Sequence, residues 1–284
     1  MSESKKQYEL LIPEKTKIFG TFALSNIEAM RLLRKFGLLR QQDEPVDKKA
    51  WGKLEGKERS FRNITEHCMV VGMVTDVILE KLEEKGHLRE QERKAGAKGA
   101  ILHDLTKRQE LEKQYGVEEE DEGVFLDPQA KEEFIAELLD KYKLSSDQRK
   151  LVALQKLTGE GSIEIKNEKI DISSSRELMQ WVILLADAMV AHTKVVSAED
   201  RMNEVINRGE YSKTSDWWYK KLYGEKQFNQ IKDKKESAKA VYGKILNFLR
   251  QTEDQLKSLL SVEENQSLLE FIENQIKNRY ATFK

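Results

Sequence analysis

The chain has 284 residues, with 49 Lys and Arg against 50 Asp and Glu, so its formal net charge is −1. This balance gives no general attraction to nucleic acid, although a local basic groove stays open as an alternative. Hydrophobic residues make up 39% of the chain and there are only 3 prolines, so we expect a packed core built from long helices rather than disorder.

Targeting and redox signals in the sequence are few. The single cysteine, Cys68, excludes an intramolecular disulfide and a zinc cluster made of thiolates. The first residues contain no long apolar run that resembles a signal peptide. No stretch approaches the roughly 18–20 apolar residues of a membrane span. We therefore expect a cytoplasmic protein without a membrane-embedded segment.

Apolar side chains recur at helical spacing through most of the chain, which predicts an all-α fold. The predicted helices cover residues 24–36, 63–84, 90–106, 131–142, 147–157, 176–195 and 198–208. Residues 163–172 instead alternate apolar and polar side chains, which predicts a small β-hairpin turning at Asn167 and Glu168. From Lys226 onward the pattern predicts a C-terminal helical hairpin that packs on the core or on a second subunit as a homodimer.

Three of the apolar helices carry polar side chains that do not match their neighbours. His67 lies in the helix over 63–84, His103 and Asp104 follow the apolar run GAIL, and Asp187 stands alone in ILLADAMV. A buried charge is costly unless it is paired or bound to a metal. One divalent cation held by all four side chains satisfies the three helices together. Two imidazoles and two carboxylates suit Mn, Fe, Ni or Co, and they accept Zn or Mg less specifically.

In order and spacing, these residues resemble the HD-domain metal-dependent phosphohydrolase superfamily, whose pattern is H…HD…D on successive helices. The matching stretches are TEHCMVV, AILHDLTK and LLADAMV, and the resemblance covers about residues 60–210. It implies a helical-bundle core at 61–210, between an N-terminal extension at 1–60 and the helical hairpin at 211–284. Because the interval 105–186 lacks the further histidines of the two-metal members, the resemblance implies a single metal ion.

The resemblance also implies an activity and residue roles. The ion would activate water to attack a phosphate ester or anhydride of a small molecule, with a nucleotide as the favoured substrate. Asp104 would help to orient that water, and Lys107, one turn later, would neutralise phosphate charge. Some members of the superfamily have a glutamate at the position of Lys107, so here another carboxylate would have to assist. The further candidates are Arg62, Lys194 and Arg201 for substrate phosphate, and Glu66 and Glu110 for the water.

The residues leave two other functions open. One is an HD-type nuclease, which needs a basic channel that the net charge does not indicate. The other is a degenerate module in which the C-terminal helices bind a partner. The aromatic run at 217–219 is more typical of packing than of base stacking, and His87 and His192 are not expected to bind the metal. Cys68, about 100° around the helix from His67, is expected to be a small buried residue that points away from the site.

Overall fold

The computed structural model describes the chain in separate stretches. They are residues 22, 25–38, 62–107, 109, 110, 113, 128–153, 174–191, 194–208, 212–231 and 233–281. Within these stretches the structure has eleven helices and one sheet of two very short strands, which confirms the predicted all-α class. None of the helices in these stretches is both long and apolar enough to cross a membrane.

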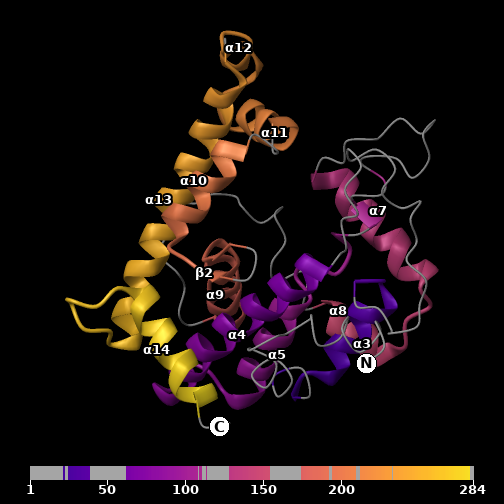
Figure 1. The fold of residues 1–284 in the computed structure, drawn as a ribbon. Helices are drawn as coiled ribbons and strands as arrows, with labels where there is room; N and C mark the ends of the chain where they lie inside the picture. The colour runs from indigo at the N-terminus through magenta and orange to yellow at the C-terminus, as the bar shows by residue number, and fades with distance from the viewer. Residues whose placement is uncertain are drawn as a thin grey trace, which may run out of the picture.

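Three helices position the polar residues that the sequence singles out (Figure 1). They are α4 (Arg62–Glu84), α5 (Glu90–Ile101) and α9 (Ser175–Ala188). The other helices are α3 (Ile27–Lys35), α7 (Pro128–Lys141), α8 (Ser146–Ala153), α10 (Ala198–Arg208), α11 (Ser212–Tyr223), α12 (Glu225–Phe228), α13 (Lys234–Leu260) and α14 (Leu268–Ala281). Buried side chains from α3, α4, α5, α9, α13 and α14 belong to one hydrophobic core.

Helix α4 is the centre of this core, and its end is set by local chemistry. Gly86 has a φ of 80°, in the left-handed region that glycine adopts without a Cβ clash. Its N–H donates to the Glu83 carbonyl at 2.8 Å, and the His87 N–H donates to the Leu82 carbonyl at 2.9 Å. This pair of hydrogen bonds is a Schellman motif, which satisfies carbonyls that the end of a helix would leave open.

Helices α4 and α5 approach each other closely because glycines face the contact. A Cβ built on Gly72 of α4 would lie 2.6 Å from Cγ1 of Ile101 on α5. A Cβ on Gly96 of α5 would overlap Cδ1 of Leu79 on α4. This close approach brings the C-terminal end of α5 beside the first turns of α4, where His67 lies.

Helix α9 is shorter than the sequence predicts. It ends at Ala188 instead of Val195, and the chain then forms strands β1 (Val190–Ala191) and β2 (Lys194–Val195). Val190 pairs with Val195 in antiparallel register, and the Val196 N–H donates to the Met189 carbonyl at 2.8 Å. The β-branched valines favour this extended backbone over further helix. The hairpin predicted at 163–172 lies outside the described residues.

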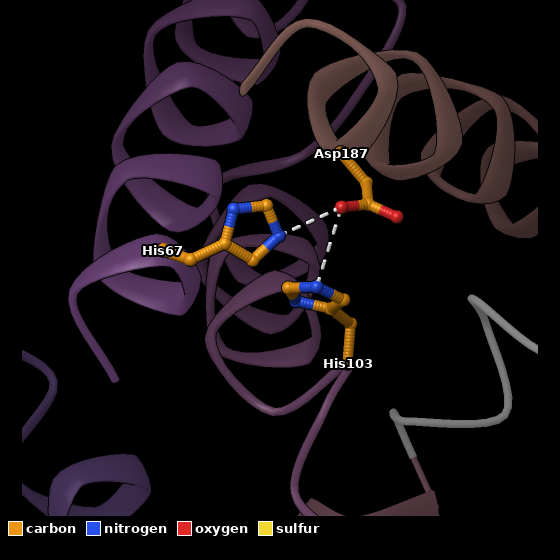
Figure 2. Close-up of side chains that lie close together, drawn as sticks. All are labelled: His67, His103 and Asp187. Atoms are coloured by element: carbon orange, nitrogen blue, oxygen red, sulfur yellow. Dashed lines mark hydrogen bonds and ion pairs between the residues drawn. The ribbon is translucent and has the colours of Figure 1, made fainter. Parts of the chain in front are cut away.

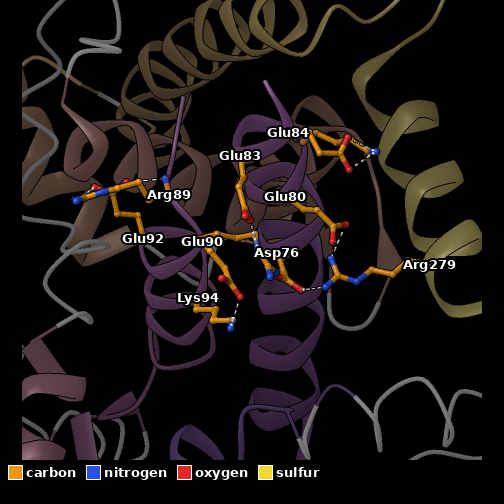
Figure 3. Close-up of polar contacts among 11 residues, drawn as sticks. Asp76, Glu80, Glu83, Glu84, Arg89, Glu90, Glu92, Lys94 and Arg279 are labelled. Carbon is orange, nitrogen blue, oxygen red and sulfur yellow. Dashed lines mark hydrogen bonds and ion pairs between the residues drawn. The ribbon is translucent and has the colours of Figure 1, made fainter. Parts of the chain in front are cut away.

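Two helices, α13 and α14, are present where the sequence predicts a C-terminal helical hairpin, and an ionic network fixes α14 to α4 (Figure 3). Arg279 of α14 contacts Asp76 and Glu80 of α4, both at 2.8 Å. Arg93 of α5 contacts the same Asp76 at 2.6 Å and Glu83 at 2.7 Å. Asp76 is buried, so two guanidinium groups from two other helices compensate its charge.

Candidate metal site

His67, His103 and Asp187 meet at one point between α4, α5 and α9 (Figure 2). The His67 Nε2 lies 2.9 Å from the Asp187 Oδ1, and the His103 Nε2 lies 3.5 Å from the same oxygen. One ligand atom from each side chain lies within 4.8 Å of the other two. Side chains separated by up to 120 positions in sequence therefore form a compact cluster.

The turns that follow α5 orient His103. The sequence predicts a helix continuing to residue 106, but α5 ends at Ile101. Beyond that point, backbone N–H groups bond to carbonyls three residues earlier, from His103 to Ala100 and from Lys107 to Asp104. These tighter turns are the usual way in which the last carbonyls of a helix are satisfied.

The same turns fix the protonation of the His103 ring. The His103 Nδ1 lies 2.7 Å from the Ala100 carbonyl oxygen, which can only accept a hydrogen bond. Nδ1 therefore carries a proton, and Nε2 is the atom that faces Asp187 and Asp104. A backbone carbonyl that holds one ring nitrogen while the other faces the ion is the common arrangement around metal-binding histidines.

Asp187 lies in the last turn of α9, at the negative end of the helix dipole. No basic residue accompanies it in that turn, so its charge must be balanced by other elements. Burial would raise the pKa of Asp187, but His103 and His67 outweigh it and hold that pKa well below its ordinary value. The carboxylate is thus ionised, and with a side chain 45% exposed it is reachable from solvent.

His103 responds to the same neighbours in the opposite sense. Burial would lower its pKa, but Cys68, Asp104 and Asp187 raise the pKa of His103 well above the ordinary value. Without a metal, a proton on Nε2 supplies the positive charge that the two carboxylates favour. A cation binding at this point would replace that proton.

Asp104 adjoins the cluster of three. Its Oδ2 lies 3.6 Å from the His103 Nε2, and its side chain is 26% exposed. Burial would raise the pKa of Asp104, but His103 and then Lys107 lower it below the ordinary value. The structure thus brings Asp104 to the edge of the three-residue cluster and the Lys107 charge near Asp104. That Asp104 binds the ion stays a prediction.

Cys68 has a position that the sequence reasoning did not foresee. It is fully buried, as expected, but it does not point away from the site. Its thiol is in hydrogen-bonding contact with the His103 side chain and the Asp104 backbone, while burial raises its pKa. Cys68 therefore supports the His103–Asp104 pair from the core side. Cys68 faces these residues because α5 packs closely on α4, and the angular position of a residue on one helix does not reveal which neighbouring helix lies there.

The other residues that the sequence analysis considers lie apart from the cluster or outside the described residues. Arg201 is paired with Glu204 at 2.9 Å on α10, and Lys194 is exposed on β2. In the part of the chain that the structure describes, neither is joined to the cluster. Glu110 accepts a 2.6 Å hydrogen bond from Thr106 and is buried. The Arg62 side chain and His192 lie outside the described residues.

The donor set fits a divalent ion. Ligand atoms lie about 2.0–2.2 Å from a zinc-like ion, so two of them are separated by at most about 4.4 Å. The contacts of 2.9 Å and 3.5 Å made by Asp187 are within that limit, and all three pairs lie within 4.8 Å. The C-terminal ends of α5 and α9 add roughly half an elementary negative charge each in this region. Two imidazoles with carboxylate oxygens suit a transition metal.

No family model matches the chain, and neither the curated proteins nor the solved structures give a match.

Proposed function

We propose that the protein is an HD-type phosphohydrolase that uses one divalent metal ion to cleave a phosphate ester or anhydride of a small molecule, preferably a nucleotide. The observation that carries the proposal is the convergence of His67, His103 and Asp187 from three separate helices. The neighbouring acidic Asp104 and basic Lys107 complete the order of residues that resembles the superfamily.

His67, His103 and Asp187 would hold the ion, with Asp104 as a fourth ligand. When bound, such an ion polarises a phosphoryl oxygen and lowers the pKa of water. The chain itself supplies the orientation, because the Ala100 carbonyl holds the His103 ring and fixes which nitrogen faces the site. The partly exposed Asp187 leaves the cluster open to a substrate on one side.

Asp104 and Lys107 would have separate roles besides metal binding, one toward the attacking water and one toward the phosphate. The Asp104 carboxylate, ionised because its pKa is lowered, can accept a proton or a hydrogen bond from the attacking water. Lys107 places a positive charge beside Asp104, where a phosphate group would develop further negative charge. The turns after α5 keep the two residues close together, since the Lys107 N–H bonds to the Asp104 carbonyl at 3.0 Å.

The proposal is tested with purified protein that has been stripped of metal and reloaded with Mn²⁺, Fe²⁺, Ni²⁺, Co²⁺, Mg²⁺ or Zn²⁺ in turn. Phosphate release is measured over a panel of nucleotides and sugar phosphates. His103→Ala and Asp104→Ala should each abolish metal-dependent release, while the helical circular dichroism signal is retained. His87→Ala is the matched control, because His87 lies in the turn after α4 and should leave activity unchanged. Full activity in the His103 or Asp104 variant rules the mechanism out.

A further inference from the structure

Helices α11 and α12, with the first half of α13, form a basic and aromatic region at one end of the molecule (Figure 1). Between residues 212 and 244 the sequence contains nine lysines and four acidic residues, in a chain whose formal net charge is −1. The positive charge is therefore concentrated locally. In Figure 1 this region projects away from α4 and α5.

Lysines and aromatic rings alternate in direct contact across this surface. The Lys221 Nζ lies 5.0 Å from the ring centre of Trp217 and 5.6 Å from that of Trp218. The Lys244 Nζ lies 5.0 Å from the ring centre of Tyr223. The lysines are exposed and the rings are half-buried, so each ring presents part of its surface next to a mobile cation.

The rings are held on rigid helices rather than on loops. Trp217 and Trp218 pack edge to face with their centres 4.8 Å apart, and Tyr219 lies 4.5 Å from Tyr223 one turn later. Asp216, next to Trp217, accepts a 2.5 Å hydrogen bond from Ser237 of α13, which fixes α11 to α13. A surface prepared in this way loses little side-chain entropy when a flat ligand stacks on it.

The lysine charges and the flat aromatic rings of this region indicate which class of ligand it can bind. Polyanions with flat rings match alternating cations and aromatic faces, and single-stranded nucleic acid has both features. An anionic membrane would instead require large apolar side chains that stand out from the surface. Among the described residues, the large hydrophobic side chain that is exposed is Ile27, on α3. The half-buried rings of α11 and α12 are therefore better suited to stacking than to insertion.

From this juxtaposition we infer that the surface formed by Trp217, Trp218, Lys221, Tyr223 and Lys244, here named the aromatic–lysine surface, binds single-stranded RNA or DNA without sequence specificity. Bases would stack on the exposed parts of the rings, and the lysines would contact the phosphates. This binding does not depend on the metal cluster and does not itself imply cleavage.

The test uses the full chain and fluorescein-labelled oligo(dT) and oligo(U) of about 12 nucleotides, with binding followed by fluorescence anisotropy. Trp218→Ala should weaken binding about tenfold, whereas Trp218→Phe, which keeps a stacking face, should stay within about threefold. Lys221→Gln should reduce the slope of log affinity against log salt by about 0.7, the value for one phosphate contact on a single strand. Lys150→Gln is the matched control, since Lys150 on α8 is 76% exposed and should leave both quantities unchanged.

Four results would overturn the inference. They are tighter binding to a duplex of the same length, equal affinities for the Trp218→Ala and Trp218→Phe variants, an unchanged salt slope in Lys221→Gln, and binding to phosphatidylserine vesicles with no binding to the oligonucleotides. Trp218→Phe and Lys221→Gln preserve the local packing, so the test stands even where the alanine variant does not fold. His103→Ala should bind the oligonucleotides as the unaltered protein does, which separates this inference from the proposed hydrolysis.

Discussion

The substitution Asp187→Asn tests the metal site without any assumption about substrate. The amide keeps the shape of the carboxylate but removes the negative charge that both His67 and His103 face. Ligand binding to the native state alone stabilises it by RT ln(1 + [L]/Kd), about 2.7 kcal/mol at a metal concentration of 100 Kd. If the substitution weakens metal binding about 100-fold, the same metal concentration then stabilises the variant by only about 0.4 kcal/mol.

The assay is urea unfolding, followed by circular dichroism, of chelator-treated protein with and without Mn²⁺. The quantity compared is the gain in free energy of unfolding that Mn²⁺ gives within each variant. This comparison cancels the effect of the substitution on the metal-free protein, which is about 1 kcal/mol or less because Asp187 is half-exposed. His87→Ala should keep the full gain. The site as described here is refuted by an Asp187→Asn variant that gains as much from Mn²⁺ as the unaltered protein, or by a His87→Ala variant that loses the gain.

Three further predictions follow from particular contacts. Because the pKa of His103 is raised well above its ordinary value, metal binding near neutral pH should displace about one proton. The metal affinity should therefore rise with pH until that pKa is passed. Calorimetry in buffers of different ionisation enthalpy measures the number of protons released, and a value of zero contradicts the prediction. Arg279→Leu should lower the free energy of unfolding by about 1–3 kcal/mol through lost charged hydrogen bonds. By contrast, Lys277→Leu, at a side chain 71% exposed, should change it by less than about 0.5 kcal/mol; equal urea midpoints for the two variants would exclude a stabilising role for the network. Gly86→Ala should lower the free energy of unfolding by about 1 kcal/mol, because Gly86 has a positive φ. Gly243→Ala, where a Cβ on α13 would meet open space, should raise it by up to about 1 kcal/mol. Urea midpoints of the two variants that move in the same direction would contradict these expectations.

The sequence predicts the long helices well because their signal is redundant. The helix predicted over 63–84 is α4 (Arg62–Glu84), since many apolar positions repeat the same period and Gly86 ends it. The helices predicted after Lys226 are likewise found as α13 and α14. In such segments one residue that departs from the pattern hardly alters the prediction, because the burial of a whole helix face stabilises the helix.

The basic residues around the site are predicted less well, for a physical reason. Lys and Arg have long side chains whose positions depend on the carboxylates within reach, and a linear sequence does not show which of these are near. Arg201 is paired with Glu204, one turn away, and Lys194 lies on β2, a strand where the sequence pattern predicts helix. His67 and His103 are easier to predict because burial restricts a polar side chain among apolar neighbours to a few partners. Asp187 is only half-buried, and it stands out because its neighbours in sequence are apolar.

Two helix ends that the sequence misplaces by five residues or more both adjoin the candidate metal site, and there is a physical reason. Helix α5 stops at Ile101, two residues before His103, and α9 stops at Ala188, directly after Asp187. With α5 ending there, the Ala100 carbonyl faces both the backbone N–H and the ring Nδ1 of His103, and the ends of both helices direct their negative dipole ends toward the cluster. A continuous helix through residue 106 would instead direct the Ala100 carbonyl along the helix axis to the N–H of Asp104. Local helix propensity is therefore overridden where ligands must be oriented, and such departures are expected at functional sites.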